Sequence, residues 1–107
     1  MLSKPFFFWQ GRTLVKVNLE EITCLYTVKN YTRIYLTKER YYMLRATLTN
    51  ALKKLPPDIF IKISRSMAVS VHFIDQIRRD HLELEGQAVP IAKQFYKSFI
   101  SNLSIIE

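Results

Sequence analysis

Short apolar runs separated by polar turns dominate the first half of the chain. Residues 6–10 read FFFWQ and end at Gly-Arg, which is a turn signal, and apolar residues return at 14–17. In the stretch 31–36, a Tyr-Arg-Tyr face alternates with a Thr-Ile-Leu face, which is typical of a half-buried strand. The pattern predicts strands at 6–10, 14–17, 22–28, 31–36 and 41–45, of which the last two pair as an antiparallel hairpin.

The apolar period becomes helical at 47–55. Thr47 is placed to cap this helix, and the prolines at 56 and 57 stop it. We expect its apolar stripe to be buried against the sheet, because so short a helix is not stable alone. The stripe consists of Leu48, Ala51, Leu52 and Leu55.

A single helical turn is expected at 18–22, between two predicted strands. Asn18 can cap this turn, and Glu20 and Glu21 suit its amino-terminal end. The turn therefore connects strands and adds no helix of its own.

The stretch 60–70, FIKISRSMAVS, is an apolar run interrupted by two cations and two hydroxyls. In a regular strand Arg65 would share its face with Ile63 and Met67, which would draw a charge into the core. The chain must therefore kink near 64–66 and turn Arg65 outward.

The last third of the chain continues with strands and ends in a helix. A strand is predicted before Arg78, an alternating strand at LELE (82–85) and another at QAVPI after Gly86. The fold class is mostly β, a β-rich α+β arrangement of antiparallel strands in one domain over 1–107, with one internal amphipathic helix and a short C-terminal helix. That helix is expected to present Phe95, Phe99, Ile100 and Leu103 on one face.

Charge indicates the kind of partner. The formal net charge is +7 and the sequence pI about 9.7, which suggests an anionic partner, most commonly nucleic acid. Cys24, the only cysteine, lies in an apolar run and is expected to be a buried, inert thiol. No stretch approaches the ~20 apolar residues that span a bilayer, so no membrane partner is expected.

The titratable residues form no catalytic constellation. His72 follows an apolar run and is interpreted as a packed histidine, and His81 has no motif around it. Glu83 and Glu85 are expected on one strand face, which is more typical of a solvated edge than of an acid pair. With two glycines there is no phosphate-binding loop. No enzyme activity, metal or cofactor is predicted.

Cations and small polar residues instead cluster at strand ends and kinks, where loops project from a rigid scaffold. Arg and Asn side chains read base edges, whereas Lys and Ser commonly contact phosphates. The phosphate-contact candidates are Lys29, Lys62, Ser64, Ser66, Arg78 and Arg79, while Asn30, Arg65 and Lys93 interrupt or follow the same apolar runs.

Two other functions remain open at this point. The tyrosines at 31, 35, 41 and 42 could stack the bases of single-stranded DNA or RNA in a small β module, although cross-strand aromatic pairs are the more usual meaning. A basic protein-interaction module, with FFFW as its docking edge, is the other alternative.

Five stretches resemble, in order and spacing, the LytTR family of bacterial DNA-binding domains. They are VNLEEITCL, KNYTRIYL, YMLRATLTNALKKLP, FIKISRSMAVSVHFIDQI and LELEGQAVPIAK, and the match runs from about residue 12 to about residue 100. The resemblance implies an elongated β domain whose loops enter successive major grooves of double-stranded DNA. The family's base-contact positions match Asn30, Arg65 and Lys93.

The chain departs from the family pattern at three points. Lys29 stands where glycine is common, Ser70 where asparagine is common, and Ala92-Lys93 where Ser-Arg is common. Lysine lacks the bidentate fork of arginine, so the third contact would be made by a point charge. The resemblance further implies a cytoplasmic transcription regulator that binds paired repeat sites. It would be either the output domain of a two-component response regulator, with receiver and sensor kinase outside this chain, or a free-standing protein.

Overall fold

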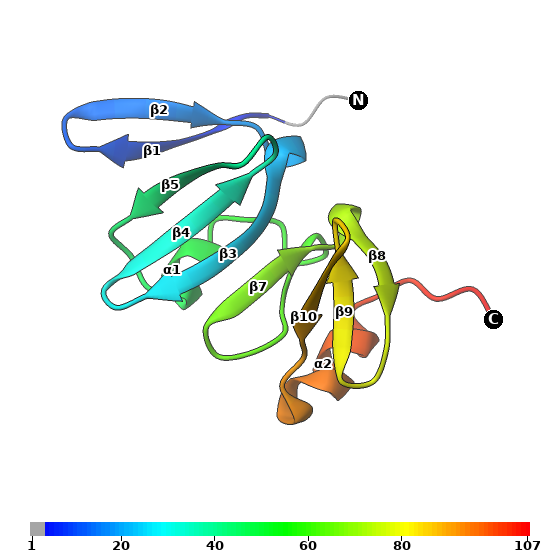
Figure 1. Cartoon of the computed structure of the whole chain (residues 1–107). Coiled ribbons are helices and arrows are strands. Elements are labelled where there is room, and N and C mark those ends of the chain that lie inside the picture. The colour runs from blue at the N-terminus through cyan, green and yellow to red at the C-terminus, as the bar shows by residue number, and fades with distance from the viewer. Residues whose placement is uncertain (1–3) are drawn as a thin grey trace.

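The computed structural model describes residues 4–107, and antiparallel β-sheet dominates this part of the chain (Figure 1). The mostly β prediction is thus confirmed. The helices are α1 (Leu48–Leu52) and α2 (Tyr96–Ser101), with short 3-10 turns η1 (Leu19–Glu21), η2 (Val71–Phe73) and η3 (Lys93–Phe95). The strands are β1 (Phe6–Gln10), β2 (Thr13–Val17), β3 (Ile22–Val28), β4 (Tyr31–Leu36), β5 (Arg40–Leu44), β6 (Phe60–Lys62), β7 (Met67–Ser70), β8 (Ile74–Ile77), β9 (His81–Leu84) and β10 (Gln87–Pro90).

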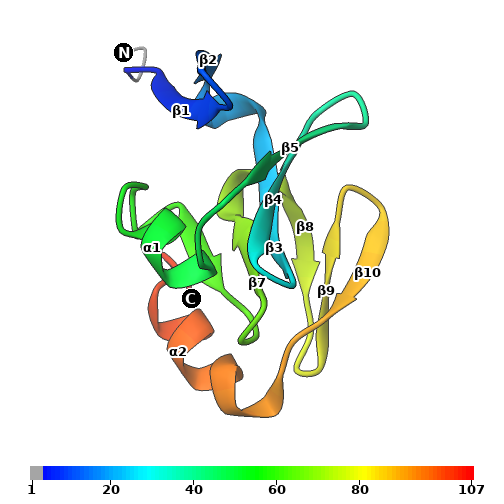
Figure 2. The same cartoon turned by 90° about the vertical axis from the view of Figure 1, so that its left-hand side faces the viewer.

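A five-stranded sheet with the order β5-β4-β3-β7-β6 forms the middle layer. Figure 2 shows α1 on one side of this sheet and the three-stranded sheet β10-β9-β8 on the other. A separate hairpin of β1 and β2 lies at one end (Figure 1). The principal extents are 46 × 35 × 24 Å, so the domain is elongated, as expected.

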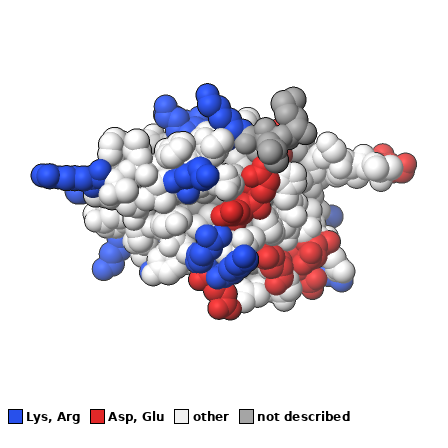
Figure 3. Space-filling view, turned by 90° about the horizontal axis from the view of Figure 1, so that it is seen from above, with Lys and Arg blue, Asp and Glu red and all other residues white. Residues whose placement is uncertain are grey.

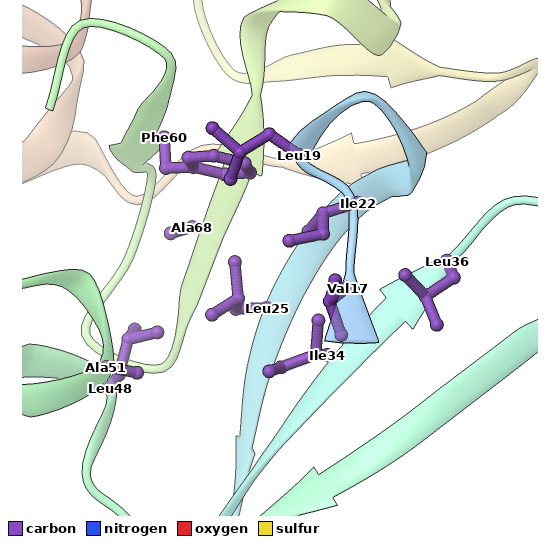
Figure 4. Close-up of a cluster of buried hydrophobic side chains, with 10 residues drawn as sticks. All are labelled: Val17, Leu19, Ile22, Leu25, Ile34, Leu36, Leu48, Ala51, Phe60 and Ala68. Atoms are coloured by element: carbon purple, nitrogen blue, oxygen red, sulfur yellow. The ribbon is translucent and has the colours of Figure 1, made fainter. Parts of the chain in front are cut away.

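Two clusters of buried side chains hold the layers together, because neighbouring residues of a strand point to opposite faces. Leu25 and Ile34 face the first cluster, which they share with Leu48 of α1 (Figure 4). On the other face of the sheet, Cys24 joins the second cluster, where Phe99 of α2 is completely buried. The buried thiol prediction is confirmed, and burial raises the pKa of Cys24.

The hairpin of β1 and β2 is anchored by its inward aromatic side chains. Gly11 has a φ of 61° at the first central position of its two-residue turn, where most L residues are strained. Phe8 packs edge-on against Tyr42, with 5.1 Å between ring centroids. At the far end, the Gln10 side-chain amide donates a hydrogen bond to the carbonyl of Met43 at 2.6 Å.

Both helices are shorter than the sequence predicts. The Thr47 cap is confirmed, since its hydroxyl accepts a 3.1 Å hydrogen bond from the amide of Asn50. Beyond Leu52 the backbone tightens, and the Leu55 amide bonds to the Leu52 carbonyl at 3.1 Å. Pro56 disfavours helical geometry in the residue before it, which ends the helix early. The C-terminal helix similarly begins as the turn η3.

Three local predictions are wrong. Asn18 makes no side-chain cap of η1; its amide group instead donates to the carboxylate of Glu21 at 3.4 Å. Glu85 lies in a turn with a φ of 51°, so it does not continue the strand face of Glu83. His72 is exposed rather than packed, because it lies in the 3-10 turn η2 at the surface.

The burial of α1 gives a stability prediction. Leu48 is buried, whereas Leu52 and Leu55 are half-buried at the margin of the first cluster. Leu48→Ala should therefore lower the free energy of unfolding by about 2–5 kcal/mol, as buried truncations do. Leu52→Ala should cost less, because the removed methyl groups are already partly hydrated. Urea denaturation of both variants measures the difference, and equal losses would contradict this view of α1.

Candidate nucleic-acid interface

Four loops lie in a row along one edge of the molecule, which runs from the left side to the bottom of Figure 1. They are the β3–β4 turn at 29–30, the β6–β7 loop at 63–66, the β8–β9 turn at 78–80 and the segment 92–94 before α2. Antiparallel topology brings these connections to the same side, because each follows a strand that runs toward that edge.

Backbone hydrogen bonds fix the loops to one another. The amide of Thr27 donates to the carbonyl of Ser66 at 2.8 Å, which ties the end of β3 to the β6–β7 loop. The amide of Ala92 donates to the carbonyl of Ile63 at 2.9 Å, and that of Ile91 to Asp80 at 2.9 Å. The row of loops is therefore a rigid element rather than a set of independent segments.

The β6–β7 loop turns Arg65 outward, as the sequence predicts. Ile63 is completely buried and anchors the start of the loop, while Arg65 is exposed. The hydroxyl of Ser64 accepts a 3.3 Å hydrogen bond from the amide of Ser66, so Ser64 stabilises the turn around Arg65.

The β3–β4 turn has an unusual backbone at Lys29. Its φ of 56° is in the left-handed region, which costs a non-glycine residue roughly 1–2 kcal/mol. This conformation explains why a glycine suits the position. Lys29 and Asn30 are both exposed at the tip of the turn.

Asn30 and Arg65 line the same groove, of about 510 Å³, together with Lys29. We call it the first groove. Sequence reasoning missed Arg45, which precedes α1, and Asn50 of α1, which line the same groove. The signal was present, because Arg45 is a cation directly after a strand, as Arg78 is.

Lys93 and Arg79 line a second groove of about 510 Å³. Tyr96 and Lys97 of α2 also line it and were not predicted, because their side of the helix was assigned only by its apolar face. The Arg79 guanidinium lies over the Tyr96 ring at 5.9 Å from the centroid.

Asp80 is the single carboxylate among the described residues that line either groove. Its oxygen lies 2.7 Å from Nδ1 of His81. The hydrogen bond with His81 is the largest cause that lowers the pKa of Asp80.

Not every candidate reaches a groove. Lys62 is half-buried in the edge strand β6 and lines neither groove. Arg78 is exposed in the β8–β9 turn, next to the second groove, and its amide closes that turn on the carbonyl of His81 at 2.8 Å. Ser70 is buried, and its hydroxyl accepts from the His72 amide, so it has a structural role.

The opposite ends of the strands carry acidic side chains. Glu20 and Glu21 lie in η1, Glu39 in the β4–β5 turn and Glu85 in the β9–β10 turn. Figure 3 views this face and shows acidic side chains among basic ones. On the loop edge Asp80 is outnumbered by cations, so the edge remains positive, which favours an anionic partner.

A protein-family model for the LytTr DNA-binding domain matches residues 12–104. The chain belongs to this LytTR family. One solved structure with the same fold is described as the LytTr DNA-binding domain of a methyl-accepting/DNA response regulator from Bacillus cereus. It is 21% identical to this LytTR chain, with a TM-score of 0.79 over 96% of this chain and 99% of that one. No curated protein matches the chain.

No helix within residues 4–107 is long and apolar enough to span a membrane. The same residues contain no group of three or more His, Cys, Asp or Glu side chains that could hold a metal ion.

Proposed function

We propose that this chain binds double-stranded DNA sequence-specifically, as part of a bacterial transcription regulator. The observation that carries the proposal is the rigid row of four cation-bearing loops, joined by backbone hydrogen bonds along one edge. Membership of the LytTR family supports the same function. Nucleic-acid backbones are the polyanions that such an edge suits.

Asn30, Arg65 and Lys93 are the proposed base contacts. Arginine can bind guanine O6 and N7 through two hydrogen bonds, and asparagine can bind adenine in the same way. Asn30 and Arg65 line one groove, so they would read neighbouring base pairs. Lys93 is a point charge without the fork of arginine, so its readout is looser.

The proposed phosphate contacts flank these residues on the same edge. Exposed cations in adjoining loops would contact phosphates on either side of each base contact. Ser64 and Ser66 would add hydroxyl contacts, although Ser64 also stabilises its loop. The set consists of Lys29, Lys62, Ser64, Ser66, Arg78 and Arg79, and the structure adds Arg45 as a candidate.

The dimensions of the domain suit binding along one side of the duplex. Successive major grooves are separated by one helical turn of roughly 34–36 Å. The longest extent of the chain is 46 Å, which exceeds that separation. As the resemblance to the LytTR family implies, loops of the row would enter successive major grooves, and paired repeat sites would take two copies of the chain.

The regulatory context follows from the family. A response regulator would join this domain to a receiver that a sensor kinase controls, and a free-standing regulator would act without one. In either arrangement the domain would act on the bacterial chromosome in the cytoplasm.

The tyrosine platform for single strands receives less support. Tyr35 and Tyr41 form a cross-strand pair with centroids 5.8 Å apart. The Arg33 guanidinium lies over the Tyr41 ring at 4.9 Å and donates to the Tyr35 hydroxyl at 3.2 Å. These rings are thus engaged within the sheet, which leaves fewer free faces for bases.

Salt dependence tests the phosphate contacts. Affinity for a duplex drawn from a random pool should fall steeply as salt rises. Arg78→Gln should weaken all duplexes about equally and flatten the logarithmic salt slope by about one unit. Lys16→Gln removes the same charge from exposed β2 in the terminal hairpin and should leave the slope unchanged. Equal salt slopes for the wild-type protein, Arg78→Gln and Lys16→Gln would contradict the assigned edge. The salt slope of Lys62→Gln decides separately whether Lys62 is part of that edge.

A further inference from the structure

An apolar cavity of about 400 Å³ lies between the terminal hairpin and α1. Phe6 and Phe8 of β1 line one side, and Ala51 lines the other. Leu25 and Ile34 of the first cluster form part of its lining, and Figure 4 shows these two side chains facing α1. Its volume is within the ~300–1,000 Å³ of small-molecule sites.

Within residues 4–107, both charged residues that line the cavity are cations. Arg45 and Lys54 are the charged side chains among the described residues that line it, and none of those residues is a carboxylate. The salt bridges among residues 4–107 are Arg40–Glu21 and Asp80–His81, so neither cation is paired there. Asn50 adds an amide to the same lining.

We infer that this cavity binds a small amphiphile with an apolar body and one anionic head group. The body would replace water against the aromatic and aliphatic lining, which is favourable in proportion to the apolar area covered. The anion would accept charge-assisted hydrogen bonds from Arg45 and Lys54. A cationic head group would be repelled by the same two side chains, and a strongly polar body would be disfavoured by the apolar lining.

The cavity shares a wall with the first groove. Arg45, Ala46 and Asn50 line both spaces. The wall is held in place by Thr32, whose buried hydroxyl donates to the Ala46 carbonyl at 2.8 Å. An anion at Arg45 would draw its guanidinium away from the groove, so ligand and DNA would weaken each other's binding. This coupling rests on the proposed DNA function, whereas the ligand site itself does not.

Isothermal titration calorimetry measures this binding directly. The probe is decanoate, titrated against the full chain in the absence of DNA. The heat of binding should saturate at one site. Decyltrimethylammonium has the same tail and the opposite charge, so it should bind at least about tenfold more weakly. No saturable change with decanoate, or equal binding of both amphiphiles, would overturn the proposal.

Two variants locate the site. Lys54→Gln should weaken decanoate binding by about threefold to tenfold, while leaving the binding of neutral decanol unchanged. Ala51→Met fills the cavity and should weaken both ligands at least about tenfold, with a thermal melt confirming that the variant is folded. Wild-type affinity for decanoate in both folded variants would refute this location.

The DNA arm uses duplex binding with and without saturating decanoate. Saturating decanoate should lower the duplex affinity of the wild-type protein. It should not change the duplex affinity of Ala51→Met, which lacks the cavity. A decanoate-bound protein with full duplex affinity would refute the shared role of Arg45. Failure to bind any duplex would contradict the proposed function, but the decanoate titration in the absence of DNA would still decide the ligand site.

Discussion

Phe99→Ala should lower the free energy of unfolding by about 3–5 kcal/mol, the range for truncating a buried aromatic side chain. Phe99 is completely buried and belongs to the second cluster, between α2 and the sheets. It joins Ile63, which anchors the loop of Arg65, to the helix that follows Lys93. Small domains are stable by only ~5–15 kcal/mol, so this loss is a large fraction of the total.

Ile106→Ala is the matched control, because Ile106 is fully exposed near the carboxyl terminus. Its effect should stay within about 0.5 kcal/mol. Urea denaturation followed by circular dichroism measures both variants. A loss below about 1 kcal/mol for Phe99→Ala would mean that α2 is not part of the core.

Arg65→Ala should lose about 1–3 kcal/mol of discrimination for the preferred duplex, equivalent to roughly 5- to 150-fold in affinity. The loop around Arg65 is fixed by the buried Ile63 and by the bond between Ser64 and Ser66. The guanidinium is therefore attached to a rigid base and can be directed at one base pair. Non-specific binding should change little.

Arg65→Lys keeps the charge and removes the fork, so it should recover only part of the loss. Each protein is titrated against the preferred duplex and against the same duplex with one guanine substituted. Equal weakening on both duplexes by Arg65→Ala would assign Arg65 to a phosphate and refute the base-reading role.

Local pattern was enough to predict most strands of this LytTR domain. The alternation at 31–36 correctly predicted β4, and the kink predicted near 64–66 lies in the loop between β6 and β7. In both places the burial of one face decides the structure, and burial follows directly from residue type.

Some features of the fold were not predicted from the hydrophobic pattern. Both helices proved shorter than their apolar stripes, because Pro56 disfavours helical geometry in the residue before it and because α2 is preceded by the 3-10 turn η3. The position of His72 at the surface follows from the 3-10 turn after Ser70, which the apolar residues around it did not indicate.

Several residues of the candidate site were predicted from the sequence, but their arrangement in two grooves was not. Lys29, Asn30 and Arg65 were selected from the sequence, and the structure brings them to one groove. Arg45 of the first groove was missed although it directly follows a strand, as Arg78 does. Lys97 of the second groove was missed because only the apolar face of its helix was assigned. Lys62 was selected by its neighbours in sequence, yet it lines neither groove.

The most direct test of the proposed function is competition among nucleic acids. A duplex is first selected by the full chain from a random pool, and labelled copies are then displaced by unlabelled competitors at one fixed salt concentration. The account predicts that the selected duplex competes at least about 10³-fold better than a scrambled duplex of the same composition, and that poly-dT competes poorly. Equal competition by the selected duplex, the scrambled duplex and poly-dT would contradict sequence-specific binding to double-stranded DNA.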